Sequence, residues 1–131
     1  MTPLPLWVAV AAGSALGGLA RFAISRGWPA APGSLPLATM GVNVLGCFLI
    51  GALSILLTRS AQGAVVAESW RVFWMTGVLG GFTTWSAFAL ESVVLTSEGA
   101  SMKALAYVLL TVVGCLIAAA VGRAVAVALS G

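Results

Sequence analysis

The stretch Gly77-Val-Leu-Gly-Gly-Phe-Thr-Thr-Trp-Ser-Ala-Phe88 lies in the middle of a long apolar segment, and the fold of the chain depends on it. Its glycines weaken a helix, and two threonines follow them directly. Inside a membrane, an interrupted helix is tolerated only where its backbone is buried in protein or lines a cavity. The stretch therefore favours either an ion or substrate site at a broken helix or a close helix crossing made of small residues. The stretch alone leaves both interpretations open.

The composition around this stretch is typical of an integral membrane protein. Of 131 residues, 61% are hydrophobic and 7% are charged, whereas soluble domains carry about 25% charged residues. There is no histidine and no visible acid–base or metal-ligand cluster, so we expect no enzymatic activity. The net charge of +3 is scattered, so we expect no nucleic-acid binding. Cys47 and Cys115 lie in apolar segments, which favours buried thiols over a disulfide.

Four apolar segments predict an all-α protein with four transmembrane helices. They cover roughly residues 4–26, 36–57, 72–96 and 103–129, and each is near the roughly 20 residues that a span needs. The third helix should be broken near its middle by the glycine–threonine stretch. The N-terminus lacks the basic region of a secretory signal, so we expect the first segment to be retained. We expect a single transmembrane domain, residues 1–131, in contact with the lipid bilayer.

Polar side chains within the spans are candidate site residues. Thr39 and Asn43 are four residues apart, so they share one helical face. An asparagine in a span is costly unless its amide finds partners, so Asn43 is either interhelical glue or a donor along a pore. Tyr107 and Thr111 repeat the spacing in the fourth segment. Arg21 either snorkels to the membrane interface or approaches a path through the protein.

The depth of these residues predicts a second, inverted copy of the chain. Four spans place both termini on one side of the membrane. Asn43, Phe88, Glu91 and Tyr107 are all within about eight residues of the other side, and at about 1.5 Å per residue they lie in that half of the bilayer. One subunit would then line half of a path, and an inverted subunit would supply the other half.

The charges of the connections agree with insertion in both orientations. Arg59, Arg71 and Arg123 lie on the side of the termini. Arg26 and Lys103 lie on the other side, with Arg21 as a third if it is counted. An orientation is set by a clear excess of Lys and Arg on one side. The distribution here is too even to select one.

These features resemble the Fluc/CrcB family of fluoride channels, and the resemblance covers essentially the whole chain. Chain length, four spans and balanced charge all match. Three local motifs match as well, the third being highly specific. They are Gly17-Gly18-x-x-Arg21, Thr39-x-Gly41-x-Asn43-x-x-Gly46 with Gly51, and Gly77-x-x-Gly80-Gly81-x-Thr83-Thr84-Trp85-Ser86-x-Phe88 with Glu91.

The resemblance implies a fluoride-selective channel that exports the anion passively and relieves its toxicity. It implies an antiparallel, dual-topology homodimer with two pores in the plasma membrane of a prokaryote, the inner membrane in a Gram-negative cell. It also implies a structural Na⁺ at the dimer interface, held by the backbone carbonyls of Gly80 and Thr83. The residues that it places along the fluoride pathway are Arg21, Thr39, Asn43, Trp85, Ser86, Phe88, Glu91, Tyr107 and Thr111.

The chemistry of these residues suits such a channel. Fluoride is small and strongly hydrated, so a selective path must replace its water with donors such as an amide, hydroxyls and the positive edges of aromatic rings. The chain departs from the family pattern at two places. Trp85 stands where the family has Phe, which puts edge-on coordination there in doubt. Thr111 and Cys115 stand where the family usually has serines, so the far end of the polar track is altered.

Two other functions fit parts of the pattern. A small dual-topology multidrug or cation/proton antiporter needs a titratable group near the middle of its first span, but the first segment has no Asp or Glu. A non-transporting assembly subunit would account for the glycines and leave the polar residues of one membrane half unexplained.

Overall fold

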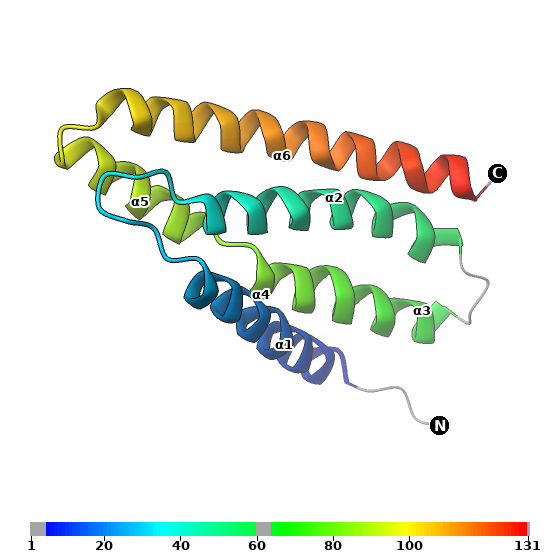
Figure 1. Ribbon diagram of the computed structural model, residues 1–131. Coiled ribbons are helices and arrows are strands. Elements are labelled where there is room, and N and C mark those ends of the chain that lie inside the picture. The colour runs from blue at the N-terminus through cyan, green and yellow to red at the C-terminus, as the bar shows by residue number, and fades with distance from the viewer. Residues whose placement is uncertain (1–4, 60–63, 131) are drawn as a thin grey trace.

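The computed structural model describes residues 5–59 and 64–130, which form helices joined by short connections (Figure 1). The elements are α1 (Leu6–Gly27), α2 (Leu37–Arg59), α3 (Ala64–Arg71), η1 (Val72–Leu79), α4 (Gly80–Phe82), α5 (Trp85–Ser97) and α6 (Ser101–Leu129). Four helical stretches are long and apolar enough to cross a membrane, namely Leu6–Gly27, Leu37–Leu57, Glu68–Ser97 and Ser101–Leu129. The prediction of four membrane-spanning helices is confirmed, although the first predicted residue, residue 4, lies outside the described part.

The third helical segment begins earlier than the sequence predicts. We expected helix from about residue 72, but α3 already covers Ala64–Arg71 and continues directly into η1, a π-helix. Within α3 the Glu68 carboxylate accepts hydrogen bonds from Arg71 Nε at 2.9 Å and Nη2 at 2.8 Å. Opposite charges three residues apart stabilise a helical turn, which explains how this polar stretch enters the helix.

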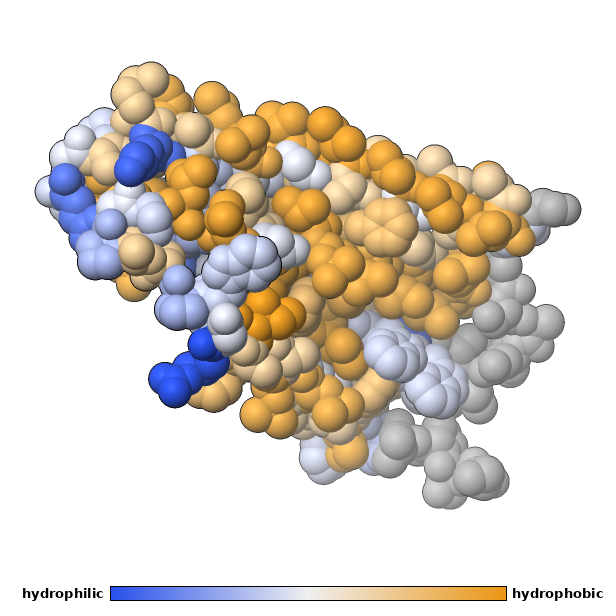
Figure 2. Space-filling model, viewed as in Figure 1, coloured by the Kyte–Doolittle hydropathy of each residue, from blue (hydrophilic) through white to orange (hydrophobic). Residues whose placement is uncertain are grey.

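The helices pack in two layers, and α2 contacts α1 and η1 across them. α2 packs along α6, and α1 packs against η1 and α4. The start of α1 and the end of α6 lie at one end of the bundle, and the α1–α2 and α5–α6 connections lie at the other (Figure 1). Figure 2 shows hydrophobic residues over most of the visible face and hydrophilic residues gathered at the end with the two connections. This distribution suits a bundle that is surrounded by lipid.

Glycines bring α1 into backbone contact with the third segment. A Cβ at Gly17 would overlap the Val78 carbonyl oxygen, and a Cβ at Gly13 would lie 2.9 Å from the Gly77 Cα. In the opposite direction, a Cβ at Gly81 would lie 2.5 Å from the carbonyl oxygen of Ser14. Gly77 and Gly81 are therefore helical and make a close helix crossing, whereas a Cβ at Gly80 would meet nothing within 4 Å.

The interruption follows the glycines and consists of two threonines. Thr83 has φ −78° and ψ 155°, and Thr84 has φ −148° and ψ 112°, so both are extended. We call these two residues the break. α4 ends before them and α5 starts after them with Trp85. Gly77 and Gly81 thus make the close crossing, and the two threonines interrupt the helix.

The close crossing predicts that Gly17→Ala destabilises the protein. The added methyl group meets the Val78 carbonyl and the Phe82 amide, which belong to the backbone and cannot rotate away. Overpacking of this kind costs about 1–3 kcal/mol of unfolding free energy. Thermal unfolding in detergent micelles would measure the loss. Gly18→Ala is the matched control, because a Cβ at Gly18 meets nothing within 4 Å; equal melting temperatures for the two variants would contradict the prediction.

Candidate functional site

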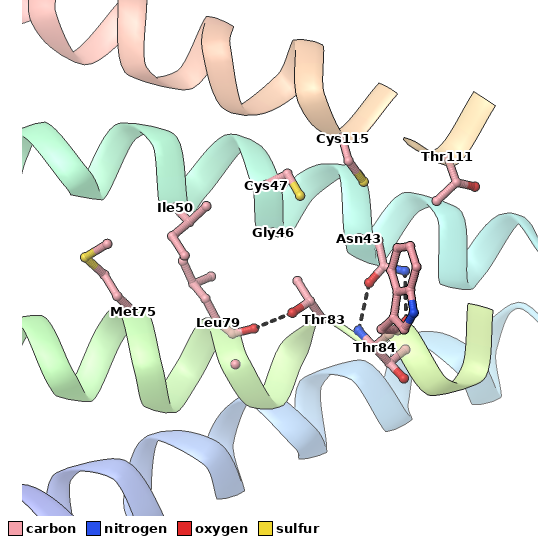
Figure 3. A pocket seen from close by; sticks show the side chains of 12 residues that line it. Asn43, Gly46, Cys47, Ile50, Met75, Leu79, Thr83, Thr84, Thr111 and Cys115 are labelled. Carbon is pink, nitrogen blue, oxygen red and sulfur yellow. Dashed lines mark hydrogen bonds between the residues drawn. The ribbon is translucent and has the colours of Figure 1, made fainter. Parts of the chain in front are cut away.

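A cavity of about 280 Å³ opens beside the break (Figure 3). Its walls come from α2, from η1 and α4, and from α6. Its polar lining includes Asn43, Thr83, Thr84 and Thr111, and the indole of Trp85 also borders it. We call this space the central cavity. It brings together residues from three spans that the sequence marks as candidates separately.

The Asn43 side chain pairs with the backbone of the break. Its Nδ2 donates to the Thr84 carbonyl at 3.0 Å, and its Oδ1 accepts from the Thr84 N–H at 2.7 Å. The amide thus replaces the peptide partner that an uninterrupted helix would provide to Thr84. Since Asn43 is buried, with 7% of its surface exposed, this pair satisfies groups that neither lipid nor water could satisfy there. One N–H of the amide remains for another acceptor.

The break also leaves two carbonyl groups without their usual helical donors. The Thr84 N–H, which would bond Gly80 in a continuous helix, goes to Asn43. The Ala87 N–H, which would bond Thr83, goes to the Thr84 hydroxyl at 3.2 Å, so Thr84 caps α5. Gly80 and Thr83 both line the central cavity. The carbonyls of these two residues, which border the cavity, therefore lack their usual helical donors.

Two neighbouring carbonyls of the third segment are occupied. The Leu79 carbonyl accepts from both the N–H and the hydroxyl of Thr83, at 3.0 Å and 2.9 Å. The Gly81 carbonyl accepts from Arg21 Nε at 3.2 Å. Arg21 thus lies against the end of α4, where a cation meets the negative end of a helix. This contact ties its guanidinium to the backbone of the third segment.

A second polar group lies nearer the α5–α6 connection. The Glu91 carboxylate accepts from the Thr39 hydroxyl at 2.8 Å and from the Tyr107 hydroxyl at 2.7 Å. Tyr107 is fully buried and Thr39 is buried. The three residues come from α2, α5 and α6, so one carboxylate connects three helices. Glu91 is partly buried, and these donors offset the hydration that its carboxylate has lost.

Aromatic rings join this group to the central cavity. The ring centroids of Trp85 and Phe88 are 4.9 Å apart, and those of Phe88 and Tyr107 are 5.2 Å apart. Phe88 is buried, whereas 72% of Trp85 is exposed. The row runs from the mouth of the cavity to the Glu91 group. Ser86 lies beside it, with its hydroxyl 3.4 Å from the Thr84 hydroxyl.

Thr111 is a candidate whose side-chain oxygen is both buried and unpaired in the described part of the chain. Its side chain is buried, with 3% exposed, and its hydroxyl has no hydrogen-bond partner within residues 5–59 and 64–130. Buried hydroxyls nearly always have a partner. A small guest in the central cavity, which Thr111 lines, could supply the missing acceptor or donor.

Two structural roles were missed by reasoning from the sequence. Thr84 serves as the backbone partner of Asn43 and as the cap of α5, and Gly81 supplies the carbonyl that holds Arg21. The capping role had a local signal, because a threonine before a new helical stretch is a preferred N-cap. The Arg21 contact had none, since it joins positions far apart in the sequence.

A family model described as "CrcB-like protein, Camphor Resistance (CrcB)" matches residues 8–123. The chain belongs to this family. It is 45% identical over 112 residues to the fluoride-specific ion channel FluC of Saccharophagus degradans. The matched residues make up 86% of this chain and 82% of the relative. It is 44% identical over 128 residues to the protein of the same name from Methylocella silvestris, with 95% and 94% covered. With its four spans, it is a multi-pass protein of a prokaryotic plasma membrane.

The pairing of Asn43 with Thr84 predicts that this CrcB protein loses stability in the variant Asn43→Leu. Leucine has a similar size, but it leaves the N–H and C=O of Thr84 unpaired in an apolar surrounding. Each buried unpaired group costs about 1–3 kcal/mol. Thermal unfolding in detergent would show the loss. Gly41→Ala on the same helix is the control, because a Cβ there meets open space; an unchanged melting temperature for Asn43→Leu would show that the pair is dispensable.

Proposed function

We propose that the chain is a fluoride-selective channel that lets the anion leave the cell passively. Membership of the CrcB family and relatives named fluoride-specific ion channels support this. The observation in the structure that carries the proposal is the leftover hydroxyl of Thr111, buried beside the central cavity. An anion that has shed its water needs such a donor.

Neutral hydrogen-bond donors would coordinate fluoride as it passes through the central cavity. The Thr111 hydroxyl and the second N–H of Asn43 are available as donors, and the row of Trp85, Phe88 and Tyr107 offers aromatic edges, which carry partial positive charge. Neutral groups replace water without holding the ion too tightly for it to leave. Ser86, beside Thr84, adds a further hydroxyl near the mouth of the cavity.

The two charged candidates would act at the ends of the path. The Arg21 guanidinium bonds the Gly81 carbonyl, so its positive charge lies near the break. The Glu91 carboxylate accepts two hydroxyl donors, from Thr39 and Tyr107, which reduces its repulsion of an approaching anion. We infer that these residues shape the entry to the pathway, and that the neutral donors form its narrow part.

An antiporter fits the same geometry less well. Coupling to protons would need an acidic group near the middle of the first span, and the sequence of α1 contains no Asp or Glu. The Glu91 carboxylate is instead held by two hydroxyls near the α5–α6 connection. A non-transporting assembly subunit would leave the unpaired Thr111 hydroxyl and the Gly80 and Thr83 carbonyls unexplained.

Fluoride efflux from liposomes, followed with a fluoride electrode, tests the proposal. The purified protein should release fluoride and retain chloride. We expect Trp85→Phe to stay selective with equal or faster efflux, because the indole N–H is a stronger donor than a phenyl edge and slows exit of the ion. Trp85→Ala should impair efflux by removing the ring. Absence of fluoride efflux from the intact protein would refute the channel.

We further propose that two copies assemble antiparallel. The candidate residues Thr39, Asn43, Tyr107 and Thr111 lie in the halves of α2 and α6 nearer the two connections. Exposed large apolar side chains such as Leu19, Leu109 and Leu116 are available to a partner or to lipid. With balanced connection charges, each orientation should be equally frequent. Labelling of single cysteines placed at the termini, in intact cells, should find each terminus on both sides of the membrane. A uniform orientation would eliminate the antiparallel dimer.

We also propose that the freed carbonyls of Gly80 and Thr83 hold a structural Na⁺ where the two copies meet. Backbone carbonyls suit a hard cation, and the hydrogen bonds of Asn43 and Thr84 leave these two available. The ion would supply positive charge close to the anion path. Na⁺ should therefore raise the melting temperature of the dimer relative to a large organic cation. Equal melting in both salts would argue against the ion.

A further inference from the structure

α2 and α6 run in the same direction and contact each other at several positions along their lengths. Both start at the end of the bundle with the two connections (Figure 1). At the first level, Thr39 and Tyr107 share Glu91. Three turns further along each helix, the backbones meet, since a Cβ at Gly51 would overlap the Ala119 carbonyl oxygen. Between these two positions, each turn of α2 therefore lies opposite the corresponding turn of α6.

Cys47 and Cys115 form the level just before this backbone contact. Cys47 lies one turn before Gly51, and Cys115 lies one turn before Ala119. Figure 3 shows both thiols extending from their helices into the central cavity, and both residues line it. Two thiols thus lie together in a cavity that also contains Asn43 and Thr111.

Two adjacent thiols without further ligands favour a soft metal ion that needs only two ligands. Thiolates bind soft metal ions. Zinc-like ions need four ligands in a tetrahedron, and no group of three or more His, Cys, Asp or Glu side chains suited to a metal exists among the described residues. An ion that accepts two ligands in a line is satisfied by the pair alone. With metal–sulfur bonds of roughly 2.3 Å, as for zinc, such an ion needs sulfurs roughly 4.6 Å apart.

The net charge of the two-thiolate complex distinguishes monovalent from divalent soft ions. A monovalent ion such as Ag⁺ on two thiolates leaves a net charge of −1, which is costly away from water. A divalent ion such as Hg²⁺ on two thiolates is neutral. Two S–H bonds break, two mercury–sulfur bonds form, and two protons leave to water, with no change of oxidation state. The apolar surroundings therefore favour the mercuric ion.

We propose that Cys47 and Cys115 form a two-thiolate site for a soft divalent cation of the mercuric kind. Occupation of the site would fill the central cavity one turn beyond Asn43 and Thr111 and would cross-link α2 to α6. If the cavity conducts fluoride as proposed above, the bound ion closes the pathway. This consequence rests on the proposed function, whereas the binding itself does not.

Titration of the reduced, metal-free protein with mercuric chloride under argon tests the site. The ultraviolet mercury–thiolate absorption and a count of the remaining thiols give the stoichiometry. One ion per chain should remove both thiols together. In Cys47→Ser or Cys115→Ser the second bond is absent, so affinity should fall by about 100-fold or more, as expected when a bivalent contact becomes monovalent. Two ions per chain, or single variants that bind as tightly as the unchanged chain, would overturn the proposal.

Two further probes separate the site from ordinary thiol reactivity. Methylmercury has a single open position, so it should bind twice per chain and gain nothing from the pair, whereas preferential binding of one methylmercury per chain would contradict paired thiols. Zn²⁺ should not compete with the mercuric ion, because it lacks two of its four ligands. Effective competition by Zn²⁺ would mean that the site holds more ligands than the two cysteines.

Fluoride efflux gives the functional readout. Each variant is compared with its own metal-free rate. Mercuric ion should block the unchanged chain, a dithiol should restore it, and the half-blocking concentration should rise by about 100-fold in either single variant. Efflux that persists in protein with both thiols occupied would overturn the assigned closure of the pathway. A chain that shows no efflux without mercury would refute the channel, and the titration would still decide the metal site.

Discussion

The pair between the Asn43 amide and the Thr84 backbone is the interaction on which the rest of the structure depends. A helix in lipid cannot stop midway unless its freed N–H and C=O groups find partners within the protein. Asn43 provides both partners at once from the neighbouring span. Because the Thr84 N–H is held in this way, the third segment can release the carbonyl of Gly80 without leaving a buried donor unpaired. The break is therefore a property of two spans together.

The position of the break is set by the glycine crossing on the other side of the third segment. Gly13 and Gly17 allow α1 to touch the backbone of η1 and α4, so the segment has no freedom to slide. Arg21, one turn after Gly17, then reaches the Gly81 carbonyl at the end of α4. α1 thus holds one side of the segment by packing, and α2 holds the other by hydrogen bonds.

Charged groups are held by the protein, and neutral donors remain at the central cavity. Glu91 is engaged by two hydroxyls and Arg21 by a carbonyl. Thr111, by contrast, keeps an unpartnered hydroxyl among the described residues. This division suits an anion that has to lose its water and leave again, because strong charges would retain it. Cys47 and Cys115 both border this cavity, where the proposed two-thiolate site would lie.

The sequence by itself determined the four spans, the interruption in the third and the residue types around it. Hydropathy, the Gly and Thr pattern and helical spacing are local properties, so they can be read along the chain. Only the tertiary structure decided which groups meet. Asn43 and Thr84 are separated by 41 positions, and Thr39 and Glu91 by 52. No local pattern could show that Gly77 and Gly81 pack while the threonines break the helix, or that Cys47 and Cys115 border one cavity. These pairings depend on how closely the helices approach, which is set by side-chain volumes on both surfaces at once.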